Sequence, residues 1–482
     1  MSSLKTESLK GAKWGFIQKL TVQPVQLMYG MVLARLITPS EMGIVGLTAV
    51  FFAIATEMSM AGFSTALIRK QNRTDDDLNT MFWFNLTMSA VLGLILFLLA
   101  PWFADFFNQP ELLWLTRISA LILFLSSTAG VHLTIYQYNR DFRTLAIIGM
   151  ITTFSGMPVC LFLAWEGYGV WALLAQNATS SLVNLFVVWK LSSWKPAFVF
   201  SRTSFASMFS FGSKLAVTSL LHIIYTNLRT FIIGKFYSPA QLGLYSRGEQ
   251  LSGIVPSTIN NVLSTISFPI LATIQNENER LTAAYRKYIK ISSVVIAWFC
   301  MTLAALAYPV VELAYGKNWI GCASFLQILC FVFGFDHICS INLNLLKVKG
   351  KSGAMLKLEI IKKLVSTLLL IYASTISVEA ICIAMVIYSQ IAVFINSYYT
   401  GKLINLSWWQ QQKDYLPYFL LSAVCAVPAW LLSGSDLHSC WKIIYGGSTS
   451  LFLYSLVLYV LRESSFMELF SLIKSKLSNQ IC

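Results

Sequence analysis

Two long apolar segments of this chain each carry polar side chains along one helical face. Residues three and four positions apart share a face of an α-helix. In the segment 11–36, the residues with this spacing are Lys19, Gln23, Gln26 and Gly30. In the segment 205–233, they are Lys214, Thr218, His222, Tyr225 and Arg229. Ammonium and guanidinium groups bind phosphates and carboxylates, so these two faces predict a binding site for an anionic ligand.

Further polar residues extend this set. Glu57 lies in the segment 42–67, and the segment 240–268 carries Arg247, Glu249, Gln250, Asn260 and Asn261. A charged residue inside a membrane is costly unless it faces protein or water. We therefore predict a cationic, water-filled cavity, and the residues expected to bind the ligand there are Lys19, Gln23, Gln26, Arg35, Lys214, His222, Arg229, Arg247 and Glu249.

Each of these positions also has a structural explanation. Lys19 and Lys214 lie within about two to three helical turns of the predicted cytoplasmic edge, where a long side chain can extend to the lipid headgroups. Arg35 and Arg229 equally suit anchors at the outer interface. His222 suits a hydrogen bond between helices better than a proton relay.

The acidic residues have two interpretations. Glu57, Glu249 and Asp336 are the candidates for coupling transport to an ion, whereas Glu249 could instead bond another helix. Structural pairing could also explain Asp336 with its neighbour His337, and the group Glu359, Lys362 and Lys363. Within that group, Glu359 and Lys363 stand four residues apart on one helical face.

Composition indicates that the helices positioning these residues cross a membrane. The chain of 482 residues is 56% hydrophobic and only 12% charged, whereas soluble domains are about 25% charged. Segments long enough to cross the hydrocarbon core predict an all-α integral membrane protein with about 14 transmembrane helices. They span approximately 11–36, 42–67, 79–100, 113–136, 144–164, 168–190, 205–233, 240–268, 287–313, 322–346, 353–373, 377–400, 415–433 and 441–461.

Basic residues predict the orientation of these helices. Lysines and arginines gather in alternate loops, and the opposite loops contain only Lys235 and Lys317. Cytoplasmic loops hold such residues preferentially, so both termini are expected in the cytoplasm. This asymmetry accounts for the net charge of +14, and no nucleic acid is expected as a partner.

The sequence contains no motif typical of catalysis or metal binding. It has no GxxxxGK[ST] loop, no GxSxG and no HExxH, and only four histidines. The nine cysteines include no CxxC pair. We therefore expect no enzyme activity, no metal and no cofactor.

A repeat about 200 residues long divides the chain. The stretch 36–44, LITPSEMGI, reappears as FYSPAQLGL at 236–244. Proline suits the first turn of a helix, and the Ser or Thr before it can cap that helix. Six spans separate the copies, which predicts two parallel, pseudo-symmetric lobes of six helices each. The predicted division is 1–200, 201–400, and 401–482 for a final helix pair with a cytoplasmic tail.

That tail has two possible forms. Its apolar residues share one helical face and favour an amphipathic helix in the membrane interface, although a frayed tail is equally compatible. These residues are Phe466, Leu469, Phe470, Ile473 and Leu477.

Several phrases resemble a known family. They are LARLITPSEMG at 33–43, MAGFSTALI at 60–68 followed by NTMFW at 79–83, GYGVWAL at 167–173, GLYSRGEQL at 243–251, and FPIL at 268–271 with Gln275. Their order and spacing resemble the polysaccharide transporter family, the Wzx-type flippases of the superfamily that also contains the MATE drug exporters and the MurJ lipid flippase. The most similar branch contains colanic-acid and teichuronic-acid exporters.

This resemblance implies a function. Such a protein moves an undecaprenyl-diphosphate-linked oligosaccharide from the cytoplasmic to the outer leaflet of the bacterial plasma membrane, by alternating access around a central cavity. It implies coupling to a gradient of H⁺ or Na⁺, contact with membrane lipids, and partnership with the polymerase and glycosyltransferases of the same pathway.

Two rival functions remain open at this point. A MATE-like ion-coupled exporter of drugs and organic cations requires carboxylates in its cavity, but the segment 11–36 contains none. A membrane polymerase or glycosyltransferase requires a large folded outer loop, and the longest outer loop in the first half is only about 100–112.

Overall fold

The protein is all-helical, as predicted. The computed structural model describes residues 2–60, 62–468 and 470–471, and these contain no β-strand. Contacts divide the chain into two compact units, Met1–Gly243 and Leu244–Cys482. A division of contacts is a different property from a sequence repeat, so the predicted domains 1–200, 201–400 and 401–482 stay a prediction.

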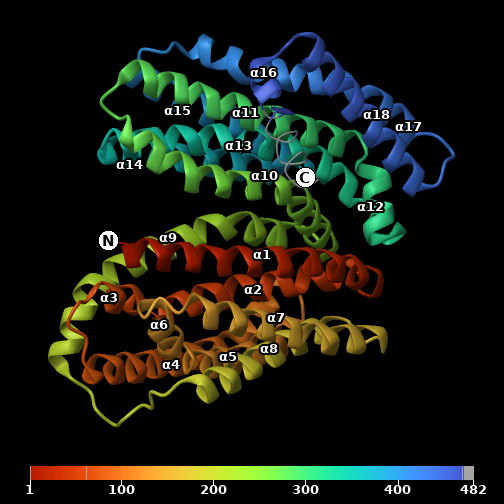
Figure 1. Cartoon of the computed structure of the whole chain (residues 1–482). Helices are drawn as coiled ribbons and strands as arrows, with labels where there is room; N and C mark the ends of the chain where they lie inside the picture. The colour runs from red at the N-terminus through yellow and green to blue at the C-terminus, as the bar shows by residue number, and fades with distance from the viewer. Residues whose placement is uncertain (1, 61, 469, 472–482) are drawn as a thin grey trace, which may run out of the picture. The chain divides into compact units, whose positions relative to one another are not determined.

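The first unit contains nine complete helices among its described residues (Figure 1). They are α1 (Ser2–Leu36), α2 (Pro39–Met60), α3 (Phe63–Arg69), α4 (Asp75–Phe107), α5 (Glu111–Ser127), α6 (Gly130–Tyr138), α7 (Phe142–Trp165), α8 (Val170–Leu191) and α9 (Arg202–Phe236). The next helix, α10 (Pro239–Thr273), begins in this unit and continues into the second.

The second unit continues with eight α-helices that the same figure labels and one 3₁₀ turn. They are α11 (Asn278–Ala305), α12 (Ala307–Tyr315), the 3₁₀ helix η1 (Lys317–Trp319), α13 (Cys322–Val348), α14 (Ser352–Ala373), α15 (Val378–Ile404), α16 (Trp408–Cys425), α17 (Val427–Ser433) and α18 (Ser439–Val460). A further short helical stretch begins at residue 464. In it, the rings of Phe466 and Phe470 stack 6.3 Å apart, whereas Leu469, Ile473 and Leu477 lie outside the described residues.

All 14 predicted segments fall on helices, but the count of 14 membrane spans is not confirmed. Within the described residues, 11 helices are long and apolar enough to cross a membrane, or 12 if α5 and α6, bent by 41°, form one span. Two long helices outside this count are α1 and α14. The first is made less apolar by its polar face, and the second carries Lys357, Glu359, Lys362 and Lys363.

Close backbone packing shapes the first unit where α2 gives way to α3. Gly62 has a φ of +70°, which favours glycine. A Cβ at this position would lie 3.1 Å from the carbonyl carbon of Gly212 in α9. The break therefore brings α3 directly against α9, and α9 also packs on α2 and α4.

A non-helical strap, residues 192–201, joins α8 to α9 and is fastened to α4. The Ala197 amide donates to Asn79 Oδ1 at 2.8 Å, and Trp83 Nε1 donates back to the Ala197 carbonyl at 2.8 Å. The Ser201 amide donates to Thr80 Oγ1 at 3.0 Å. These bonds satisfy backbone groups that a helix would otherwise pair internally.

A large apolar core lies in the second unit, and α10, α11, α13, α15, α16, α17 and α18 contribute to it. A buried polar network runs through it: Tyr285 Oη donates to Gln411 Oε1 at 2.8 Å and lies 2.9 Å from Asn342 Oδ1. Because α16 and α18 pack against α11, the final helix pair is integrated into this unit.

Candidate functional site

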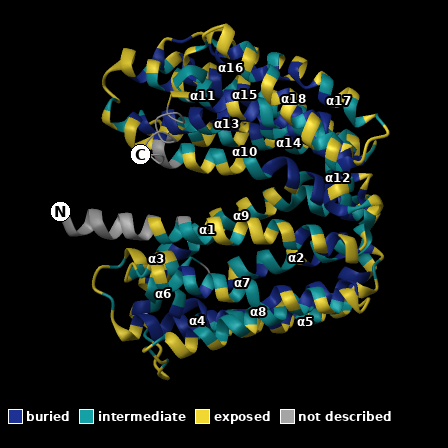
Figure 2. Cartoon of the chain, turned by 45° about the vertical axis from the view of Figure 1, so that its right-hand side comes forward, coloured by how far each residue is buried: buried dark blue, intermediate teal, exposed yellow. Residues whose placement is uncertain are grey.

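The two predicted polar faces lie on neighbouring helices of the first unit. Figures 1 and 2 both show α1 and α9 side by side. Both helices are only partly covered along their middle. Among the residues 13–32 whose burial is described, only Gly30 is buried, and none of the residues 213–231 is. Exposed apolar side chains such as Met28 and Leu221 share these stretches.

The predicted ligands on these helices are largely accessible. Five are exposed: Lys19, Gln23, Gln26, Lys214 and His222. Arg35, in the last turn of α1, is also exposed, and Arg229 is half-buried. The first unit thus presents basic and amide groups on two adjacent helices, in the chemical combination that binds anions.

Arg247 is placed differently, because its side chain is only 5% exposed within the second unit. Its Nη1 donates to Gln250 Oε1 at 2.7 Å. The guanidinium lies 5.5 Å from the ring centre of Tyr315 and 6.0 Å from that of Trp319. Aromatic faces attract cations, so the end of α12 and the turn after it hold this charge in place.

The predicted acidic residues belong to both units, Glu57 to the first and Glu249 and Asp336 to the second. Glu57 and Glu249 are half-buried, and Glu249 Oε1 accepts from Tyr245 Oη at 3.1 Å. Asp336 is exposed on α13. Its neighbour His337 is buried and bonds Ser293 Oγ at 2.9 Å through Nε2.

The charged residues of α14 form an ion pair at a spacing of three residues, whereas the predicted pair is four residues apart. Lys362, only 4% exposed, pairs with Glu359 at i,i+3. Lys363, the partner expected at i,i+4, is half-buried. The pair explains how α14 carries a buried ammonium group.

The two repeat phrases contact each other within the first unit. A Cβ added to Gly43 would lie 2.7 Å from the Pro239 carbonyl carbon, and one added to Gly243 would lie 2.8 Å from that of Pro39. In both cases the carbonyl oxygen is closer still. The start of α2 and the start of α10 therefore cross backbone to backbone, which only glycine permits.

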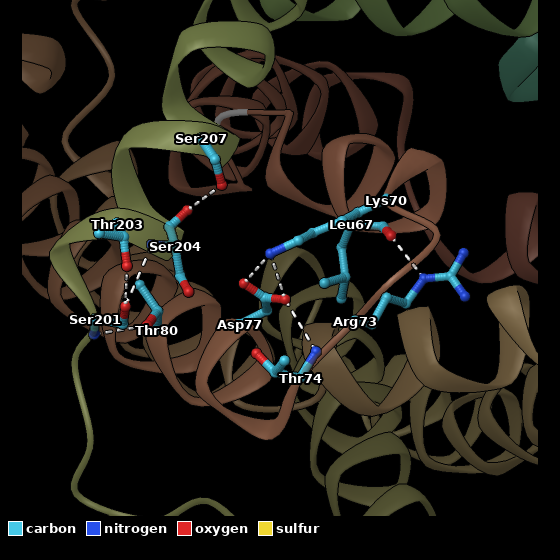
Figure 3. A network of polar contacts seen from close by, with 10 residues as sticks. All are labelled: Leu67, Lys70, Arg73, Thr74, Asp77, Thr80, Ser201, Thr203, Ser204 and Ser207. Carbon is cyan, nitrogen blue, oxygen red and sulfur yellow. Dashed lines mark hydrogen bonds and ion pairs between the residues drawn. The ribbon is translucent and has the colours of Figure 1, made fainter.

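A basic and hydroxyl-rich network occupies the end of the first unit that we predict to be cytoplasmic (Figure 3). Lys70 Nζ lies 2.7 Å from both carboxylate oxygens of Asp77, which is fully buried. Asp77 Oδ2 also accepts from the Thr74 amide at 3.0 Å and completes a capping box at the start of α4. Arg73 Nε donates to the Leu67 carbonyl at 2.8 Å.

Sequence reasoning missed two charged groups. Arg117 in α5 lies 4.7 Å from the ring centre of Phe97. Arg286 forms a two-pronged ion pair with Asp414, at 2.7 and 2.8 Å, and Lys290 lies 3.6 Å from the same carboxylate. Asp414 falls just outside a predicted span, and its partners are more than 120 residues away in sequence, so only the basic residues in α11 signalled this cluster.

These features define a class of protein: a multi-pass, all-helical membrane protein with basic faces on long helices. Residues 32–324, more than half of the chain, match the model of the polysaccharide biosynthesis protein family. The chain therefore belongs to that family, and the resemblance inferred from its motifs is confirmed.

Curated relatives agree with this assignment. The chain is 26% identical to the succinoglycan biosynthesis transport protein ExoT of Rhizobium meliloti, over 73% of this chain and 72% of ExoT. It is 24% identical to the teichuronic acid biosynthesis protein TuaB of Bacillus subtilis over 91% of each chain. It is also 24% identical to the lipopolysaccharide biosynthesis protein WzxC of Escherichia coli, over 75% and 74%.

Solved structures show the same fold. The lipid II flippase MurJ in an inward closed conformation superposes with a TM-score of 0.73 at 14% identity, covering 94% of this chain and all of that one. An inward-facing MATE multidrug transporter superposes with a TM-score of 0.60 at 17% identity, covering 80% and 94%. At these identities the likeness concerns the fold alone.

Proposed function

We propose that this protein moves an oligosaccharide linked to undecaprenyl diphosphate from the cytoplasmic to the outer leaflet of the bacterial plasma membrane, for the synthesis of a surface polysaccharide. The observation that carries the proposal is the pair of largely exposed basic faces on α1 and α9, with amides on α1, in a chain of the polysaccharide biosynthesis family. The ammonium and guanidinium groups bind the diphosphate, and the amides of α1 add hydrogen bonds to the same phosphates. The polyprenyl tail stays in lipid.

The transport cycle we propose is alternating access between the two repeats. Lys19 and Lys214 meet the diphosphate at the cytoplasmic end, and Arg35, Arg229 and Arg247 act toward the outer end. A gradient of H⁺ or Na⁺ drives the cycle, with Glu57, Glu249 and Asp336 as the coupling candidates. The arrangement of these residues around one chamber stays a prediction.

We also propose that both termini are cytoplasmic. The basic turn between α3 and α4, with Lys70 and Arg73, supports this orientation because cytoplasmic loops retain positive charge. The polymerase and glycosyltransferases of the pathway are the protein partners in this proposal. The MATE-like alternative has weaker support, because the similarity to MATE transporters is one of fold whereas the family match is to polysaccharide biosynthesis.

Deletion of the gene tests the proposal. The deletion strain should accumulate one lipid-linked glycan that remains protected from a membrane-impermeant glycosidase, since it stays in the cytoplasmic leaflet. Mass spectrometry of extracted lipids identifies it, and complementation with the intact gene is the control. Sensitivity of the deletion strain to many unrelated drugs, with no glycan accumulating, would contradict the proposal and revive the drug-export function.

A further inference from the structure

A cavity of about 300 Å³ lies inside the first unit, between α2, α5 and α8. This volume is at the lower end of the range for small-molecule sites, about 300–1,000 Å³. Its walls include the apolar Phe52, Leu115 and Leu174, and its polar lining residues are Thr48, Ser119, Asn177, Ser180 and Ser181. The predicted anion-binding residues do not line it.

The polar groups of this cavity retain hydrogen-bonding capacity. Ser119 and Asn177 make no side-chain hydrogen bond to another described residue, so each can both donate and accept. Ser181 Oγ accepts from Ser126 Oγ at 3.2 Å and keeps its own proton to donate. Thr48 Oγ1 donates to the Ile44 carbonyl at 3.3 Å and keeps lone pairs to accept.

This lining does not suit the diphosphate or the polyprenyl chain of a lipid-linked glycan. A diphosphate requires cations, and the described lining residues include no ionisable group. A polyprenyl chain makes no hydrogen bonds and would leave the hydroxyl and amide groups without partners. A sugar ring fits both properties of the cavity, because its rim of hydroxyls donates and accepts while its C–H faces pack on apolar walls.

We propose that this cavity binds an uncharged sugar residue of the transported glycan, apart from the cations that bind the diphosphate. The inference rests on the proposed function, and it assigns the charged and the uncharged parts of the ligand to different residues. Affinity for the charged part resides on the faces of α1 and α9, whereas discrimination between glycan-bearing and bare lipid resides in the cavity.

Two variants with a matched control test this assignment. Asn177→Leu removes the amide at nearly constant volume, and Ala49→Phe fills the cavity. Asn184→Leu makes the same chemical change two turns further along α8, outside the lining. The probes are the lipid-linked glycan extracted from the deletion strain and undecaprenyl diphosphate without sugar, titrated calorimetrically into the purified full-length protein.

The intact protein should bind the glycan-bearing lipid at least about tenfold more tightly than bare undecaprenyl diphosphate, as expected for hydrogen bonds made only to sugar. Asn177→Leu and Ala49→Phe should abolish this preference and leave the affinity for undecaprenyl diphosphate within about twofold, which also shows that they are folded. Asn184→Leu should retain the preference.

Other outcomes are decisive as well. A preference retained in both cavity variants would mean that the cavity holds only water and would overturn the assignment. A preference absent from the intact protein, or lost equally in Asn184→Leu, would also overturn it. Failure of the intact protein to bind either lipid would instead reject the proposed function itself.

Discussion

At the scale of single residues, the structure separates charges that stabilise the fold from charges available to a ligand. Asp77 is fully buried and paired with Lys70, whereas Lys19 and Lys214 are exposed. The sequence alone shows all three as charges near apolar segments. Burial by helices distant in sequence is what distinguishes them, and no local pattern records it.

Replacement of Asp77 by alanine should lower the free energy of unfolding by about 1–2 kcal/mol. It removes the carboxylate that accepts from Lys70 and completes the cap of α4. Lys70 is about one-third exposed, so water compensates part of the loss. Thermal unfolding in detergent measures the effect. Asp76→Ala changes an exposed neighbour in the same turn and should be close to neutral; an equal effect of both variants would contradict the role of Asp77.

Replacement of Arg247 by alanine should reduce transport more than it reduces protein abundance. The variant loses a cation that Gln250, Tyr315 and Trp319 hold in one position. Surface polysaccharide produced by the complemented deletion strain measures transport, and immunoblotting of membranes measures abundance. Arg247→Lys keeps the charge and should recover part of the activity. Normal transport by Arg247→Ala at normal abundance would remove Arg247 from the site.

At the scale of helices, the sequence predicts where helices lie along the chain but not where a helix is interrupted. The apolar period and length predicted every span segment, because membrane crossing requires both. The break between α2 and α3 was not predicted. At this break Gly62 closely approaches Gly212, about 150 residues away, and a glycine in a helical pattern does not reveal such a neighbour. The same limit applies to the strap on α4.

Replacement of Gly43 or Gly243 by alanine should impair the protein, at a cost of about 1–3 kcal/mol in unfolding free energy. Each new Cβ would collide with a proline carbonyl of the other repeat phrase, and backbone cannot rotate aside as a side chain can. Transport should fall together with the stability of the variant. Thermal unfolding and polysaccharide output are the measurements.

A matched control lies in the same helix. Gly46 has nothing within 4 Å of its would-be Cβ, so Gly46→Ala should be neutral or slightly stabilising. Equal behaviour of Gly43→Ala and Gly46→Ala would show that the start of α10 does not need to approach α2 so closely.

At the scale of the whole molecule, composition and repeat pattern predicted the fold class, and the family match confirms the resemblance. Membrane insertion imposes strong constraints on sequence, so the fold class can be predicted from the sequence alone. The division into contact units is harder to predict from the sequence. Helix α9 packs on α2, α3 and α4 and belongs to the first unit, although it begins the second sequence repeat. Tertiary packing, rather than order along the chain, decides that membership.

The mutual approach of Pro39 to Gly243 and of Pro239 to Gly43 has an evolutionary consequence. Exchange of equivalent partners is the geometry of an isologous dimer, in which one patch meets its own copy across a two-fold axis. If gene fusion produced this chain, its forerunner was a homodimer of half-length subunits joined at this point. The glycine at this position would then have been needed before the fusion. Its two copies, Gly43 and Gly243, would both have to be retained after it.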